Sequence, residues 1–206
     1  MNRVFVTAVV KNVPLEEYGR YLPPMKARRF GKLQKRALVT ALKAMEISGI
    51  AQPDAILNGT AMGCMENSVQ ILESMLKEGE AVSMPTCFMQ STHNTVASLI
   101  AIYTQNHGYN TTYAHRGISF ACALHDAFMQ MRMGRIRTAL VCENDEITRY
   151  QENNLQLFGK IAPEDKSEAW MLSVDPGEHP LYELLDVRII HQKGAEDRAV
   201  ILKNLL

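Results

Sequence analysis

Short apolar runs alternate with amphipathic segments along this chain, and the alternation restricts the possible folds more than any other feature. Extended, β-branched runs predict strands at residues 3–10, 54–59, 110–114, 138–142, 168–174 and 184–190. Apolar residues at helical spacing predict helices in residues 25–46, 64–79, 96–103 and 120–131. The alternation of predicted strands and helices along the chain predicts an α/β fold with a mixed, mainly parallel sheet sandwiched by helices.

Length and composition predict one compact domain over residues 1–206. The 22 basic residues balance the 22 acidic ones, which argues against nucleic acid as a partner because phosphate neutralisation needs a basic surplus. No apolar run is long enough to span a membrane. The four cysteines lack the short spacing of zinc or redox pairs, so we expect reduced thiols in a cytoplasmic protein. The sequence shows neither metal-ligand spacing nor a glycine-rich phosphate loop, so we expect no metal and no cofactor.

The stretch "NTTYAHRGISFACALHDA", residues 110–127, runs from an extended segment through a glycine into an amphipathic helix. Many α/β enzymes present a nucleophile at a turn of this kind. The nearest thiol, Cys122, lies five residues after Gly117. A helix advances about 100° and about 1.5 Å per residue, which puts Cys122 roughly 140° around and about 7.5 Å along the helix from that glycine. We therefore expect Cys122 to point away from the turn and to pack as a small buried residue.

The other thiols and His93 are weaker candidates for chemistry. Cys87 precedes a predicted helix, whose dipole lowers the pKa of a nearby thiol, but a structural or incidental role is the favoured interpretation. His93 stands next to Asn94 at a helix start, where capping and loop hydrogen bonds are the commoner use. Cys64 and Cys142 are expected to be structural.

Polar residues flank the glycine turn and follow the next strand. His115 and Arg116 are placed either to bind an anionic or thioester ligand at the carboxyl end of the strand or to form hydrogen bonds across a subunit interface, and both interpretations stay open. His125 and Asp126 are expected to be solvated on the polar face of the helix. The acidic run Glu143–Glu146 is predicted to be a surface turn or a partner for arginines.

Basic side chains crowd one short stretch of the chain, namely Lys26, Arg28, Arg29, Lys32, Lys35 and Arg36. One interpretation is a docking surface that attracts an acidic partner by electrostatic steering. The other, which we favour, is a solvated helix face with one or two arginines paired to acids such as Glu46 or Asp54.

Four segments resemble, in the same order, the N-terminal half of β-ketoacyl-acyl carrier protein synthases, which have the thiolase fold. "MKARRFGKLQKRAL" resembles the family's arginine-rich helix start "RRMSRL", and "PTCFMQSTHNTVAS" resembles the helix before the nucleophile strand. "NTTYAHRGISFACALHDAF" resembles the nucleophile turn and helix, and "KSEAWMLSV" resembles the strand "EGAAALVLE". The chain is most similar to short N-terminal-like members found with aryl-polyene and flexirubin-type pigment pathways. The resemblance implies half of a thiolase-like fold.

The resemblance also marks an expected loss of chemistry. The family's reactive cysteine lies in a turn resembling "SSACATSA", and alignment of that turn from Asn110 puts Gly117 at the cysteine position. The family's paired catalytic histidines lie in a second half, for which this chain has no counterpart. Condensation needs a thiolate to hold the acyl group and donors to stabilise the enolate and oxyanion, so we expect no condensing activity.

Partners follow from the same resemblance. The strand before the turn, which includes Asn110 and Thr112, pairs across the dimer axis in family synthases, so we expect a homodimer or a complex with a full-length synthase. In the docking interpretation of the basic stretch, the acidic partner is the acyl carrier protein, which would bind Arg28, Arg29, Lys32, Lys35 and Arg36.

The leading hypothesis is a non-condensing partner or chain-length-factor-like subunit in fatty-acid or polyene (polyketide-type) biosynthesis. One alternative is a cysteine-dependent acyltransferase or thioesterase that uses Cys87 or Cys122 with His93 or His115. The other alternative is a binding module for the acyl carrier protein.

Overall fold

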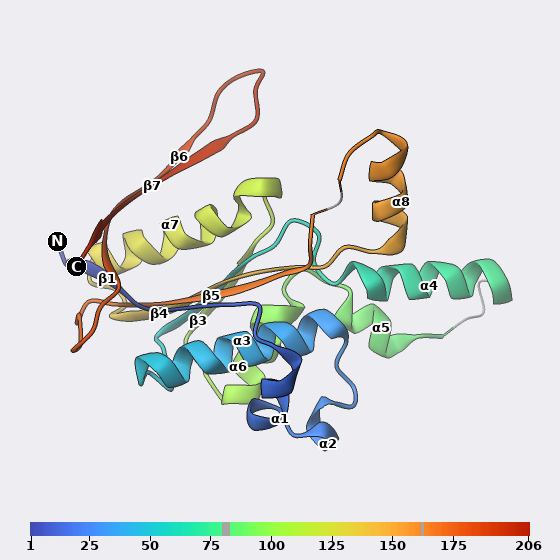
Figure 1. Ribbon diagram of the computed structural model, residues 1–206, viewed down its shortest axis with the longest axis horizontal. Coiled ribbons are helices and arrows are strands. Elements are labelled where there is room, and N and C mark those ends of the chain that lie inside the picture. Colours follow the sequence, from blue (N-terminus) through green and yellow to red (C-terminus); the bar gives the residue numbers. More distant parts are fainter. Residues whose placement is uncertain (80–82, 162) are drawn as a thin grey trace.

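The computed structural model describes residues 1–79, 83–161 and 163–206 as a sheet with helices on both faces (Figure 1). The strands are β1 (Val4–Lys11), β2 (Ala55–Gly59), β3 (Tyr109–Tyr113), β4 (Thr138–Asp145), β5 (Lys166–Ser173), β6 (Tyr182–Ile190) and β7 (Arg198–Leu205). The helices are α1 (Tyr18–Tyr21), α2 (Pro24–Ala27), α3 (Lys32–Ser48), α4 (Met65–Glu78), α5 (Pro85–Gln90), α6 (Thr95–Thr104), α7 (Ser119–Arg132) and α8 (Arg149–Leu157), with 3-10 turns η1 (Leu15–Glu17) and η2 (Arg116–Ile118).

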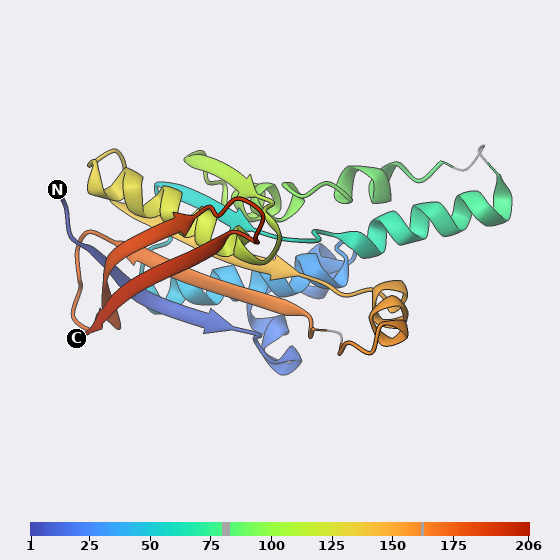
Figure 2. The ribbon, with the colours of Figure 1, turned by 90° about the horizontal axis from the view of Figure 1, so that it is seen from above.

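The described residues form a seven-stranded sheet in the order β3-β2-β4-β5-β1-β6-β7. Helices α3 and α6 cover one face and α7 covers the other, as Figure 1 shows. Two apolar clusters result, one on each face, because strands such as β2 and β4 are buried on both sides. In contrast, α4 and α5 reach away from the sheet, and neither contains a fully buried residue (Figure 2).

The sheet is mixed, but the prediction that it is mainly parallel needs correction. Parallel pairing joins only β3, β2 and β4 among the described strands, and the other four ladders are antiparallel. Parallel neighbours need a crossover connection that packs back on the sheet. No helix lies between β6 and β7 in the described chain, and β7 returns antiparallel beside β6. Strand β1 lies between β5 and β6 and is antiparallel to both, so β5 and β6 run in the same direction.

Several element boundaries also differ from the sequence prediction. The helix expected over residues 25–46 is split into α2 and α3, and the backbone N–H of Gly31 donates to Gln34 Oε1 at the start of α3 (2.8 Å). Strand β4 continues to Asp145, so most of the predicted acidic turn is strand. Neither α8 nor β7 was predicted, since both are short and largely exposed, with weak apolar patterns.

No helix in the described ranges combines the length and apolar character needed to cross a bilayer.

Gly59 brings the end of β2 against the first turn of α7. A Cβ atom at this position would lie 2.4 Å from the backbone nitrogen of Phe120 and 2.6 Å from the carbonyl carbon of Ser119. Both atoms belong to backbone that cannot move aside like a flexible side chain. The missing side chain therefore sets the distance between the sheet and the helix that follows the glycine turn.

We predict that Gly59→Ala destabilises the fold by about 2 kcal/mol or more, because overpacking forces the backbone of α7 away from β2. Gly117→Ala is the matched control, since a Cβ at Gly117 meets no atom within 4 Å. Urea unfolding followed by circular dichroism measures both. Equal stability of the two variants would show that the close approach does not constrain the fold.

Candidate functional site

The turn between β3 and α7 is held by one buried hydroxyl. Ser119 Oγ accepts a hydrogen bond from the backbone N–H of His115 (2.8 Å) and donates one to the carbonyl oxygen of Arg116 (2.7 Å). Arg116 has a φ of +50°, in the left-handed region that few residues other than glycine adopt. The polypeptide therefore makes a tight, locally strained reversal immediately before the helix.

Gly117 sits at the exposed point of this reversal. A Cβ built on it has open space around it, so packing does not require a glycine there. The position thus has room for a side chain, yet the residue supplies none. The tip of this reversal therefore carries no nucleophilic side chain.

Cys122 is less buried than expected. Ala121 and Ala123 are buried, but Cys122 is half-buried and borders a cavity of about 570 Å³ that His115 also lines. The prediction that it packs as a buried residue is therefore wrong. Burial raises the pKa of its thiol, and the nearby carboxylate of Asp197 raises it further, so the thiol is held in its protonated form.

The other thiols show no arrangement for nucleophilic chemistry. Burial raises the pKa of Cys64 and of Cys142 to about 12. Cys87 lies within α5 rather than before a helix, and its Sγ is 3.6 Å from Gln70 Oε1. His93 is exposed, and no hydrogen bond connects it to a cysteine in the part of the chain that the structure describes.

His115 is bound to a residue that the sequence gave no reason to connect with it. Its Nε2 lies 2.8 Å from Asp197 Oδ2, and Nδ1 of His191 lies 2.6 Å from Asp197 Oδ1. Hydrogen bonds from His115 and then His191 are the main causes of a lowered pKa for the Asp197 carboxyl group. Asp197 comes from the loop between β6 and β7, 82 residues after His115. No local pattern could have indicated this cluster.

His125 and the acidic run also require correction. Nδ1 of His125 lies 2.7 Å from the carbonyl oxygen of Val187, so this side chain is half-buried against β6 rather than solvated. Asp145 accepts hydrogen bonds from Thr60 Oγ1 (2.7 Å) and from the backbone N–H groups of Ala61 (2.9 Å) and Met62 (2.8 Å). Asp145 therefore organises the loop after β2.

Glu146 is almost fully buried and accepts a hydrogen bond from the backbone N–H of Glu66, in the first turn of α4 (2.9 Å). Burial raises the pKa of Glu146, and this hydrogen bond opposes the rise. The carboxylate thus satisfies a helix N-terminus that its own loop leaves uncapped. Neither Asp145 nor Glu146 belongs to a surface turn.

The residues predicted for the subunit interface and for carrier-protein docking differ in burial and in hydrogen bonding. Asn110 Nδ2 donates to the carbonyl oxygen of Ala97 in α6 (3.0 Å), whereas the hydroxyl of Thr112 is buried with no hydrogen-bond partner among the described residues. Arg36 pairs with Asp165 (2.7 Å) and donates to the carbonyl oxygen of Asp145. The remaining basic candidates are exposed or half-buried, namely Arg28, Arg29, Lys32 and Lys35.

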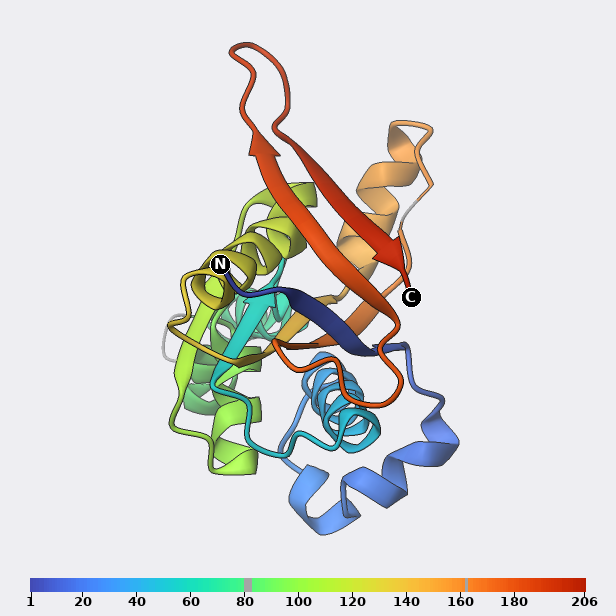
Figure 3. The ribbon, with the colours of Figure 1, turned by 90° about the vertical axis from the view of Figure 1, so that its left-hand side faces the viewer.

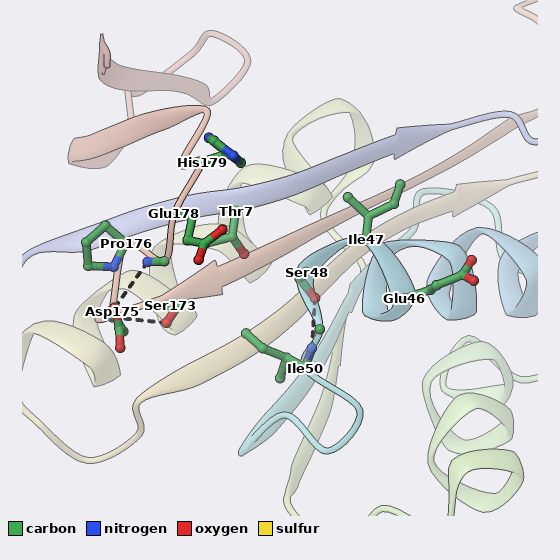
Figure 4. A pocket seen from close by; sticks show the side chains of 12 residues that line it. Thr7, Glu46, Ile47, Ser48, Ile50, Ser173, Asp175, Pro176, Glu178 and His179 are labelled. Carbon is green, nitrogen blue, oxygen red and sulfur yellow. Dashed lines mark hydrogen bonds between the residues drawn. The ribbon is translucent and has the colours of Figure 1, made fainter.

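A second hollow lies at the opposite end of the sheet. It has a volume of about 490 Å³ and lies between the end of α3 and the loop after β5 (Figure 4). Some of its polar groups form hydrogen bonds within their own loop, such as the backbone N–H of Asp175 to Ser173 Oγ (3.0 Å), and Glu46 accepts a hydrogen bond from the hydroxyl of Tyr21 (2.5 Å). Within the described ranges, no group of three His, Cys, Asp or Glu side chains could hold a metal ion, here or elsewhere.

A family model identifies the chain. The model for "Beta-ketoacyl synthase, N-terminal domain" matches residues 11–196. The chain belongs to this family. Half of a thiolase-like fold is confirmed.

The chain is similar in sequence to one polyketide synthase and in fold to several ketosynthase structures. The polyketide synthase-nonribosomal peptide synthetase ACE1 of Pyricularia oryzae is 26% identical over 157 residues, which are 74% of this chain but only 4% of that protein. A ketosynthase (ApeO) in complex with its chain length factor (ApeC), from Xenorhabdus doucetiae, shares the fold with a TM-score of 0.70 and 21% identity. That match covers 95% of this chain and 86% of the other.

A third similar structure is a type II polyketide synthase acyl-carrier protein in complex with its ketosynthase (AntDE:AntF). It has a TM-score of 0.78 and 12% identity over 92% of this chain and 69% of the other. At these identities the structural likeness establishes the fold, which is that of a ketosynthase.

Proposed function

We propose that this chain is a non-condensing ketosynthase-like subunit that works beside a full-length synthase, as a chain length factor does, in fatty-acid or polyene (polyketide-type) biosynthesis. Gly117 carries the proposal, because the resemblance aligns it with the family's reactive cysteine and a glycine cannot hold an acyl group. The similar fold of a ketosynthase in complex with its chain length factor supports it. The resemblance to short members of aryl-polyene and flexirubin-type clusters suggests the pathway, and such a subunit would work in the cytoplasm.

The free edge of β3 supports a role for a partner subunit. Among the described strands, β3 pairs only with β2, so its other edge presents unpaired backbone groups. Its residues are exposed or half-buried, and Tyr109 is 43% exposed. A strand from a synthase or from a second copy of this chain would complete the sheet there.

A cysteine-dependent acyltransferase or thioesterase is the second candidate function. One observation favours it, namely that Cys122 and His115 line the same cavity. The raised pKa of Cys122 argues against it, because the thiolate is the nucleophile.

We predict that incubation with an acyl-thioester leaves the intact mass of the chain unchanged at neutral pH, since the pKa values of the Cys64, Cys122 and Cys142 thiols are raised. Iodoacetamide labelling is the matched control for thiol access, and it should modify Cys87 and Cys122 before the buried Cys64 and Cys142. An acyl adduct that disappears in Cys122→Ala, but not in Cys87→Ala, would establish the acyltransferase instead.

We predict that Tyr109→Lys weakens association with a full-length synthase about tenfold or more, because a charge on the edge of β3 opposes strand pairing. Tyr150→Lys is a matched control: Tyr150 is 45% exposed on α8, and each tyrosine donates its hydroxyl to one carboxylate. Co-purification and analytical ultracentrifugation measure the association. Self-association without a synthase would assign the edge to a homodimer, and equal binding by both variants would contradict the proposed interface.

The acyl carrier protein is a further proposed partner, and a similar fold occurs in a ketosynthase bound to an acyl-carrier protein. We expect Arg28→Glu with Arg29→Glu to weaken binding about tenfold at low salt, with the difference disappearing as salt screens the charges. Arg135→Glu with Arg137→Glu is the control, because these exposed arginines precede β4 at the other end of the sheet. Binding that ignores salt and both charge reversals would remove the basic segment from the proposal.

A further inference from the structure

The tip of the β6–β7 hairpin, residues 191–197, closes over the turn around Gly117. Figure 3 shows the hairpin (orange to red) extending well beyond the rest of the sheet. A hydrogen bond connects the hairpin tip to the turn, because Asp197 Oδ2 lies 2.8 Å from Nε2 of His115. A cavity of about 640 Å³ lies between the tip and the turn, and Gly117 is part of its wall.

Basic groups converge on this cavity from both sides. The rings of His115 and His191 each contact one oxygen of the Asp197 carboxylate. Arg116 also lines the cavity, and its guanidinium makes no hydrogen bond or ion pair within the described part of the chain. Glu196 is the second acidic residue of the wall. The Asp197 carboxylate therefore occupies the point where two imidazoles meet, beside a free guanidinium.

Exposure makes this contact exchangeable. The side chains of His115 and His191 are 52% and 79% exposed, whereas that of Asp197 is 19% exposed. Contacts between exposed charged groups are weak, so an external anion can compete with Asp197. The fork of an arginine matches the oxygens of a carboxylate or a phosphate, and Arg116 is the group that Asp197 leaves unused.

We propose that His115, His191 and Arg116 form a binding site for a carboxylate or phosphate group, which Asp197 occupies in this structure, and that a bound anion displaces Asp197 and releases the hairpin tip. The charged group of a ligand would bind in the cavity between the turn around Gly117 and the hairpin tip. Movement of the tip would open or close this cavity. This role goes beyond that of a partner subunit, because the chain would bind the anion without a synthase.

Trypsin cleavage after Lys193 reports release of the tip, because Lys193 is exposed within it. Asp197→Asn should raise the cleavage rate there about fivefold, the population change that an exposed contact of this class supports. Cleavage after Lys160, far along the chain from the hairpin, is the internal reference. Asp186→Asn is the matched control, because Asp186 is on the same hairpin but pairs with Arg188. An unchanged rate in Asp197→Asn would overturn the role of Asp197.

Binding is tested with two probes, inorganic phosphate and acetate, against sodium chloride at equal ionic strength. We expect saturable shifts in the NMR signals of the His115 and His191 rings and faster cleavage after Lys193. Both effects should weaken in Arg116→Gln. Saturation by phosphate alone would assign a phosphate ligand, and saturation by acetate alone would assign a carboxylate ligand. Shifts that chloride reproduces, or that do not saturate with either probe, would overturn the site.

These measurements need no synthase, so their failure is separable from failure of the proposed function. Loss of the anion site would leave the interface at β3 untouched. Loss of partner binding in Tyr109→Lys would likewise leave the contact between Asp197 and His115 in place.

Discussion

The close approach of Gly59 to the first turn of α7 determines where the turn around Gly117 lies. Because Gly59 has no side chain, the backbone of Ser119 and Phe120 lies directly against the end of β2. Ser119 then holds the reversal between β3 and the helix through two short hydrogen bonds. The position of Gly117, at the carboxyl end of the parallel strands, follows from this contact rather than from any interaction of Gly117 itself.

Acidic and amide side chains at the same end of the sheet serve structure. Asn144 Nδ2 donates to Asn58 Oδ1 (2.8 Å), and the hydroxyl of Ser167 donates to Asn144 Oδ1 (2.5 Å), which links β2, β4 and β5 in the core. Asp145 and Glu146 continue β4 and satisfy backbone donors of the neighbouring loop and helix. The carboxylates of Asp145 and Glu146 are occupied in this way, whereas Asn58 Nδ2 is buried with no hydrogen-bond partner among the described residues.

Periodicity predicted the central strands and helices because the spacing of apolar residues within a short run of sequence defines the buried face of each element. Strands β1, β2, β5 and β6, and most of α3 and α7, lie where the residue pattern puts them. The pattern could not show the direction of β5, β6 and β7, since direction depends on which strands become neighbours. Helical periodicity could not give the burial of Cys122 either, because the exposure of this side chain depends on what packs against α7.

The sequence by itself determined the family and the alternation of strands and helices, and it showed that a glycine lies in the turn between an extended segment and an amphipathic helix. These features are local, because each is carried by a short run of residues or by its spacing. Only the tertiary structure decided that Asp197 meets His115 and His191, that Asp145 organises the loop after β2, and that Arg36 is paired internally. Those contacts join residues far apart in the chain, and chain folding rather than local pattern brings them together.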